Sequence, residues 1–145
     1  MIIVKTDASV QNDGRVGIGW EIEITGYTEG YLQANTITGH DYLEGKYTSM
    51  EGEMLALFRG FKEAIRLGER DVIKLLTDCQ PLVKKIKNHI SVFDGSYVQT
   101  IHNLSDHIDH WDVDWVSREQ NTVADRQAHV GLDKLRQQQA TGLSH

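Results

Sequence analysis

The sequence MIIVKTDAS, residues 1–9, indicates the first strand of a buried sheet and ends it with an acid. Residues 2–4 form a dense β-branched run, which is typical of a strand covered on both faces. The run stops at Asp7, where a carboxylate is costly unless a positive group such as a metal ion lies nearby. A turn cap is the other explanation for Asp7, and this stretch does not decide between the two.

The composition limits the class of protein. The 145 residues predict one domain over residues 1–136, followed by a polar, frayed tail over residues 137–145. The net charge of −6 gives no overall attraction for nucleic acid, so such a function would depend on a local site. The single cysteine, Cys79, excludes an internal disulfide and favours a reducing compartment. Because neither a long apolar run nor a signal-peptide pattern is present, we expect a cytoplasmic protein without membrane contact.

Three strands are predicted before the first helix. Over residues 15–24, apolar residues alternate with glycine or glutamate, which is typical of an antiparallel strand with one covered face. Residues 11–14 have strong turn chemistry, residues 31–38 form a weaker strand, and residues 39–47 are expected to be a loop. The sequence therefore predicts a three-stranded antiparallel meander.

The first helix brings two acids, and only one of them has a clear structural role. Apolar residues recur at helical spacing over residues 54–65, and Gly68 ends the helix. Thr48 and Glu51 fit a capping box, in which the glutamate accepts a hydrogen bond from the N-cap backbone amide. That role leaves Glu53 available for chemistry, although periodicity alone does not choose it over Glu51.

A second buried strand also leads to an aspartate. Residues 72–77 are densely apolar, Asp78 follows them, and Pro81 lies in the first turn of a short helix over residues 81–88. Because a strand-to-helix turn lies at the carboxyl end of a parallel strand, Asp78 is expected where open α/β sheets bind ligands. The lysines of the short helix are interpreted as a solvated face rather than a phosphate track.

A third helix and a further strand are predicted next. The helix, residues 97–111, carries several histidines, which we interpret as solvated side chains rather than zinc ligands. The strand, residues 111–117, alternates two aspartates that face water with Trp111, Val113 and Trp115 on its covered side.

The last helix contains a fourth acid. Asn121 is a good N-cap residue, and apolar residues at helical spacing follow it. Asp125 falls in the first turns, where the helix dipole favours an anion. The chain thus has acids at the ends of two strands and near the starts of two helices.

Four segments in this order resemble type 1 ribonuclease H: TDAS at residues 6–9, GEMLAL at 52–57, TDCQPLVKKI at 77–86 and VSREQNTVADRQA at 116–128. The resemblance covers nearly the whole chain, and each segment supplies one acid. It implies an α/β fold of the ribonuclease H-like kind, which is a mixed five-stranded sheet with helices on both faces. Three antiparallel strands come first in that sheet, and parallel strands follow.

The resemblance also implies an activity. The acids that hold two Mg²⁺ ions in this family, where Mn²⁺ can substitute, match Asp7, Glu53, Asp78 and Asp125. The implied reaction is hydrolysis of the RNA strand of RNA/DNA hybrids, which leaves a 5′-phosphate and a 3′-hydroxyl. Ser49 and Gln80 match positions that sense the 2′-hydroxyl groups of RNA, although either could be an ordinary surface residue. We expect the protein to act as a monomer.

Two features depart from well-known bacterial members of the family. The loop at residues 117–120 has no histidine to help product leave, and Arg118 could take its place. Residues 88–96 lack the lysines and arginines of the basic protrusion that grips the hybrid, as in shorter archaeal and Gram-positive-type members. Two other functions therefore stay open, a nucleic-acid-binding domain with little or no catalysis and the same hydrolysis on double-stranded RNA.

Overall fold

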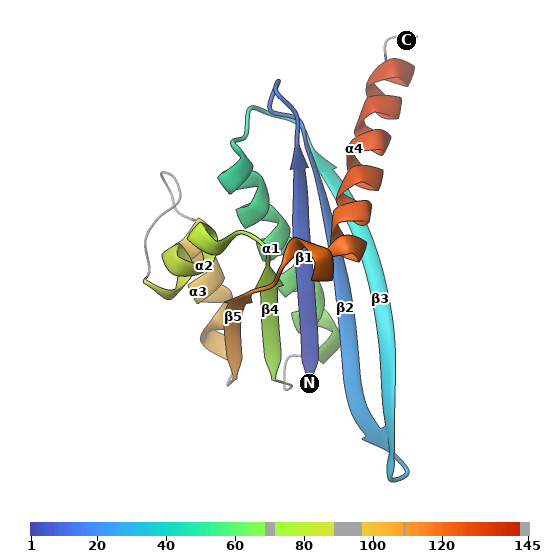
Figure 1. The fold of residues 1–145 in the computed structure, drawn as a ribbon, viewed down its shortest axis with the longest axis vertical. Helices are drawn as coiled ribbons and strands as arrows, with labels where there is room; N and C mark the ends of the chain where they lie inside the picture. The colour runs from blue at the N-terminus through green and yellow to red at the C-terminus, as the bar shows by residue number, and fades with distance from the viewer. Residues whose placement is uncertain (69–71, 89–96, 109, 143–145) are drawn as a thin grey trace.

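The fold is given by a computed structural model, which describes residues 1–68, 72–88, 97–108 and 110–142 (Figure 1). The helices and strands follow the predicted order. They are β1 (Ile2–Val10), β2 (Val16–Thr28), β3 (Tyr31–Leu43), α1 (Ser49–Gly68), β4 (Ile73–Thr77), α2 (Gln80–Lys87), α3 (Tyr97–Leu104), β5 (Trp111–Trp115) and α4 (Thr122–Gly142). There are two short 3₁₀ helices. η1 (Ser105–His107) follows α3, and η2 (Arg118–Gln120) lies between β5 and α4.

One five-stranded sheet in the order β3-β2-β1-β4-β5 organises these elements. β1 pairs antiparallel with β2 and parallel with β4, so the predicted mixed sheet is confirmed. The parallel ladder between β1 and β4 ends at the pair Thr6↔Thr77, whereas β1 itself continues to Val10. The sequence predicted that the strand ends at Asp7, and this prediction was wrong. Asp7 is the first residue of β1 beyond the ladder with β4.

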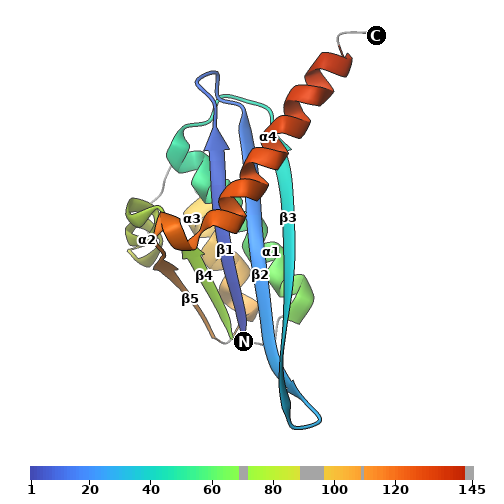
Figure 2. The same ribbon diagram turned by 45° about the vertical axis from the view of Figure 1, so that its right-hand side comes forward.

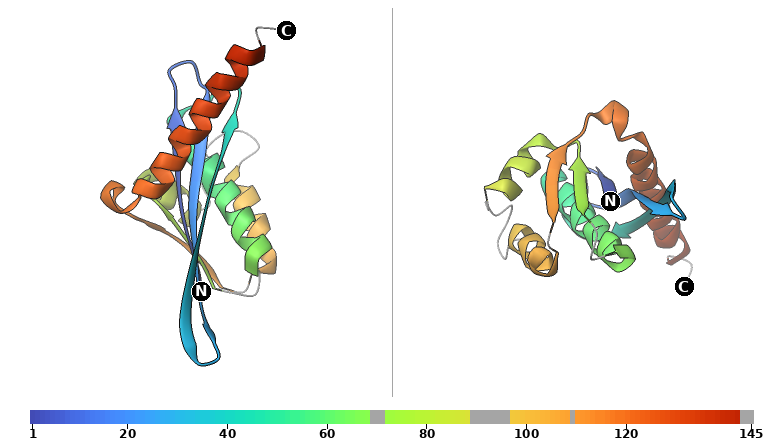
Figure 3. Two further views of the ribbon diagram at one scale, coloured as in Figure 1. Left: turned by 90° about the vertical axis from the view of Figure 1, so that its right-hand side faces the viewer. Right: turned by 90° about the horizontal axis from the view of Figure 1, so that it is seen from below.

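Helices cover both faces of the sheet (Figure 3). α1 packs on β1 and β2 with α3 beside it, while α4 crosses β1, β2 and β3 on the opposite face (Figure 2). Burial of one large apolar side chain contributes about 1.5–3 kcal/mol relative to its exposure. The largest fully buried side chains include Ile2, Ile22, Met54, Leu57, Phe61, Ile73 and Leu75.

The face of β2 that lies under α4 is closed to water near the start of the strand. The alternating pattern predicted one covered face only, but Gly17 and Gly19 are buried as well. A Cβ added at either glycine would overlap the backbone of Ala128 in α4, so the missing side chains allow the helix to lie directly on the strand. Because Gly19 pairs with Asp7, this close packing brings the first turns of α4 next to Asp7.

Two predicted segments were wrong in their extent. β3 continues to Leu43, so the first half of the predicted loop at residues 39–47 is strand that pairs with β2. α4 continues to Gly142, so residues 137–142 are helical rather than a frayed tail, and residues 143–145 lie outside the described residues. Within the described ranges, no helix is both long and apolar enough to cross a membrane.

The predicted third helix is shorter than its periodicity indicated. α3 ends at Leu104, and Trp111 begins β5 instead of ending the helix. Val113 is buried as predicted, but Trp115, the last residue of β5, is 46% exposed. The two aspartates of β5 face water, as predicted.

Candidate metal centre

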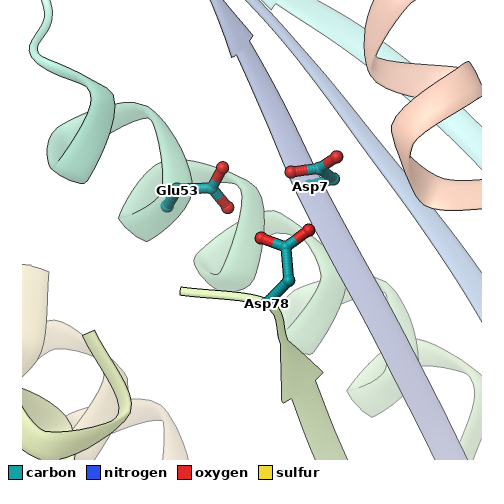
Figure 4. Close-up of side chains that lie close together, drawn as sticks. All are labelled: Asp7, Glu53 and Asp78. Carbon is teal, nitrogen blue, oxygen red and sulfur yellow. The ribbon is translucent and has the colours of Figure 1, made fainter. Parts of the chain in front are cut away.

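Three acids from distant parts of the chain meet beside the carboxyl end of β4 (Figure 4). Asp7 comes from β1, Glu53 from the second turn of α1, and Asp78 from the residue directly after β4. One carboxylate oxygen of each acid lies within 4.8 Å of the others. Because β4 stops before Asp7, the edge of β1 is open there, and the side chains of Glu53 and Asp78 can reach Asp7.

The fourth predicted acid, Asp125, lies at the rim of the same cavity. This cavity has a volume of about 410 Å³, and its lining residues besides the four acids are Ala8, Val10, Ser49 and Arg118. The side chain of Asp125 is 56% exposed, and its Oδ1 lies 3.5 Å from Nε2 of His129 in the next turn of α4. Asp125 thus faces the three-acid cluster without being part of it.

Burial raises the pKa values of two of these acids. Burial, together with the carboxylates of Asp78 and Asp125, raises the pKa of Asp7 to about 7, against the hydrogen bonds with Glu53 and with the backbone N–H of Ala8, which lower it. Burial, with repulsion from Asp7 and Asp78, raises the pKa of Glu53 to about 10. Among the described residues, Oε2 of Glu53 has no hydrogen-bond partner although it is buried. Hard oxygen ligands that lack partners and repel one another fit a divalent cation.

These shifts predict how stability depends on pH when no cation is present. The unfolded chain releases both protons near the ordinary pKa values of 3.8 and 4.5, whereas the folded state keeps them to higher pH. The contribution of the two carboxyls is therefore complete below about pH 4 and declines up to about pH 7 for Asp7 and about pH 10 for Glu53. Denaturant unfolding in EDTA measures the contribution of Glu53 as the difference in the free energy of unfolding between wild type and Glu53→Gln.

The wild-type protein should lose stability relative to Glu53→Gln as the pH rises from about 5 to about 9. A difference that stays constant, or that changes in favour of wild type, would show that Glu53 ionises freely in the folded state. Asp133→Asn is the matched control, because it removes an exposed acid of α4 that does not line the cavity.

The predicted capping box at the start of α1 is confirmed. The backbone N–H of Thr48 donates to Oε1 of Glu51 at 3.0 Å, and the N–H of Glu51 donates to Oγ1 of Thr48 at 3.2 Å. Glu51 therefore serves the helix end, while Glu53, half a turn further on, faces the other acids. The box fixes the first turn of the helix that carries Glu53.

Thr48→Ala is expected to lower the free energy of unfolding by about 1 kcal/mol, because two helix amides lose this reciprocal arrangement. Thr48→Ser keeps a hydroxyl at the same position and should stay within a few tenths of a kcal/mol of wild type, as roughly expected for equivalent caps. Urea denaturation of the three proteins checks this. Equal midpoints for Thr48→Ala and Thr48→Ser would contradict it.

The residues predicted to contact substrate differ in position. Ser49 lines the cavity, whereas Gln80 begins α2 as an exposed residue and is not among the cavity residues. Arg118, in η2, is the one basic side chain among the described residues that line the cavity. The segment predicted to lack a basic protrusion, residues 88–96, lies almost entirely outside the described residues.

No histidine of the described residues belongs to the cluster of Asp7, Glu53 and Asp78. His102, in α3, donates from Nε2 to the backbone carbonyl of Ile86 at 2.9 Å, which is a structural contact between α3 and α2. His129 was not singled out from the sequence, although its spacing four residues after Asp125 places the two on one face of a helix. Within the described ranges, the one group of at least three potential ligands is Asp7, Glu53 and Asp78.

For Asn121, the sequence predicted a position before the last helix but not the contacts of its side chain with the site. Asn121 precedes α4, as the N-cap prediction requires, but it is only 1% exposed. Its side-chain amide donates to the carbonyl of Thr6 and to Asp78 instead of capping the helix. No local pattern distinguishes a buried asparagine before a helix from an exposed one.

Comparison with protein families gives one match. The family model described as reverse transcriptase-like matches residues 30–131, a range that includes Glu53, Asp78 and Asp125 but not Asp7. A search of curated proteins finds no match.

Solved structures share the fold at low sequence identity. RNase H1 from the halophilic archaeon Halobacterium salinarum NRC-1 has a TM-score of 0.74 and 23% identity, over 92% of this chain and 98% of that chain. The N-terminal RNase H domain of a Mycobacterium tuberculosis protein, solved as a fusion with maltose-binding protein, has a TM-score of 0.74 and 21% identity, over 94% and 96% of the two chains. LC11-RNase H1, isolated from compost by a metagenomic approach and solved with an RNA/DNA hybrid, has a TM-score of 0.74 and 19% identity, over 93% and 99%. The chain therefore has the RNase H fold.

Proposed function

Since this chain belongs to the reverse transcriptase-like family, we propose that it is a divalent-cation-dependent endonuclease that hydrolyses the RNA strand of RNA/DNA hybrids. The observation that carries the proposal is the meeting of the Asp7, Glu53 and Asp78 carboxylates within 4.8 Å. The hybrid is the proposed substrate because LC11-RNase H1, which shares the fold, was solved in complex with one.

The cavity requires cations before it can accept a phosphodiester. Its four carboxylates face one basic side chain, Arg118, and the chain as a whole has a net charge of −6, so the bare site repels phosphate. In this proposal the ions are held by Asp7, Glu53, Asp78 and Asp125, whose hard oxygens suit Mg²⁺ or Mn²⁺. When bound, two such ions supply an attacking water of lowered pKa and charge stabilisation for the leaving 3′ oxygen.

The residues of the chain have further roles in this proposal. Because the pKa of Glu53 is raised to about 10 and that of Asp7 to about 7, protons on these acids compete with cations, so cation affinity rises with pH. Ser49, on the wall of the cavity, is a candidate for contact with a 2′-hydroxyl, and Gln80 is a second candidate outside it. Arg118 contacts the phosphate, and the products carry a 5′-phosphate and a 3′-hydroxyl.

Incubation of end-labelled RNA/DNA hybrid, duplex RNA and duplex DNA with Mg²⁺, Mn²⁺ or EDTA tests the proposal. The expected result is cutting of the RNA strand of the hybrid, with either cation and not in EDTA. Cleavage of duplex RNA in preference to the hybrid would keep the chemistry and change the substrate. If the protein binds the hybrid but cleaves it under none of these conditions, the proposed enzymatic function is wrong and the chain is a nucleic-acid-binding domain.

A further inference from the structure

Asn121 is buried at the point where three acid-bearing elements meet. Its relative exposure is 1%, and the other buried polar or charged residues of the described chain are Thr6, Asp7 and Thr77. A primary amide buried this deeply costs free energy unless its polar atoms are hydrogen-bonded. The contacts of its side chain therefore indicate what the residue does.

The amide nitrogen of Asn121 contacts both β1 and Asp78, the residue directly after β4. Nδ2 donates to the backbone carbonyl of Thr6, directly before Asp7, at 2.9 Å, and to Oδ2 of Asp78 at 3.4 Å. Both partners are acceptors, so the nitrogen and not the oxygen of the amide must face them. The backbone carbonyl of Asn121 accepts the N–H of Asp125 at 3.1 Å. One residue thus contacts β1 beside Asp7, Asp78 itself, and the turn that carries Asp125.

Helix capping does not account for this side chain. An N-cap asparagine stabilises a helix when its Oδ1 accepts an N–H of the first turn. Here Oδ1 of Asn121 is buried and has no hydrogen-bond partner among the described residues. The side chain therefore gives up the capping bond, and the bonds it makes instead connect β1 and Asp78 to the start of α4.

We propose that Asn121 is a positioning residue, whose side-chain amide fixes the carboxylate of Asp78 relative to Asp7 and Asp125. The donated hydrogen bond restricts the rotation of the Asp78 carboxylate, and the bond to Thr6 fixes the start of α4 against β1. Groups that hold a metal ligand in place typically change metal affinity about 10- to 100-fold when they are removed. This inference rests on the proposed cation-dependent function.

Asn121→Ser separates positioning from capping. Serine is as good an N-cap residue as asparagine, so α4 should still form, but its side chain is too short to reach both acceptors. The readout is the rise in melting temperature with added Mg²⁺, because an ion that binds the folded state stabilises it. We expect the Mg²⁺ concentration for half of the full shift to increase roughly 10- to 100-fold in Asn121→Ser. In hybrid cleavage, kcat at low Mg²⁺ should fall and recover at high Mg²⁺, with KM for the hybrid unchanged.

Ile101→Val is the matched control, since Ile101 is fully buried in α3 and is not among the cavity residues, and the loss of one buried methylene destabilises the core. It should lower the melting temperature without moving the Mg²⁺ midpoint. An unchanged Mg²⁺ midpoint in Asn121→Ser would make Asn121 merely structural and overturn the inference. If the Mg²⁺ midpoint shifts in Asn121→Ser but the wild-type protein cuts no duplex, the inference is supported and the proposed function is refuted. A wild-type protein without any Mg²⁺ response would overturn both.

Discussion

Asp7→Asn is expected to lower the rate of hybrid cleavage by about 10³-fold or more. Asp7 is the central member of the cluster, with Glu53, Asp78 and Asp125 all close enough to change its pKa or share its hydrogen bonds. An amide keeps the shape of the side chain but removes a negative ligand from the cation site. Loss of about 4 kcal/mol of charge stabilisation in the transition state corresponds to roughly a thousandfold in rate.

The same variant should become more stable in the absence of cations. Asp7 is 6% exposed and lies against other carboxylates, so Asn removes a buried acid that repels its neighbours. In EDTA near pH 8 the melting temperature should rise, and the added effect of Mg²⁺ should disappear. Asp112→Asn, at an exposed position of β5, is the matched control and should leave both cleavage and Mg²⁺ response unchanged. Asp7→Asn with cleavage close to that of wild type would refute the assignment of this acid.

Gly19→Ala is expected to destabilise the protein by about 3 kcal/mol, which is large for the addition of one methyl group. The new Cβ would overlap the backbone of Ala124 and Ala128 in α4, and a helix backbone cannot move aside as a flexible side chain can. Because Gly19 lies opposite Asp7 in the β1–β2 pairing, displacement of α4 should also move Asp125 away from Asp7 and reduce cleavage.

Gly26→Ala, in the same strand, is the matched control. A Cβ at Gly26 meets nothing within 4 Å, so the substitution should be neutral or stabilising by about 0.5 kcal/mol, because alanine loses less conformational freedom than glycine. Urea denaturation compares the two variants with wild type. Equal stability of Gly19→Ala and Gly26→Ala would show that α4 does not lie on β2 as described.

The order of elements could be predicted from the sequence because the apolar period changes from two to 3.6 residues where strand gives way to helix. The end of β3 could not be predicted in this way. Residues 39–43 begin with glycine and include His40 and Asp41, and they become strand because the start of β2 supplies backbone partners, from Trp20↔Gly39 to Val16↔Leu43. A distant partner, rather than local preference, decides this boundary.

Glycines at alternate positions of a strand are ambiguous for a different reason. Gly17 and Gly19 fit a water-facing side of β2 as well as they fit close contact with another backbone, and only the position of α4 distinguishes the two. The last turns of α4 are a similar case. Their polar residues indicated fraying, yet Gln139 accepts a hydrogen bond from Arg15, which lies far away in the sequence.

The candidate site was more accessible to sequence reasoning than the packing around it. Asp7 and Asp78 follow buried strand residues, and the capping box accounts for Glu51 and leaves Glu53. The roles of neighbours such as Asn121 depend on contacts between residues more than 40 positions apart, as in its bonds to Thr6 and Asp78. Those contacts follow from the sheet register and have no signature in a single sequence.

The proposed function depends on the binding of divalent cations by the carboxylates of Asp7, Glu53 and Asp78 together. X-ray diffraction from crystals of the wild-type protein soaked in Mn²⁺ tests it most directly, because the anomalous signal locates the ion independently of the protein atoms. We expect an anomalous peak within about 2.5 Å of oxygens from these acids, a distance typical of hard cations bound to carboxylates. A well-ordered site with no peak at saturating Mn²⁺, and with the three carboxylates turned away from one another, would contradict it.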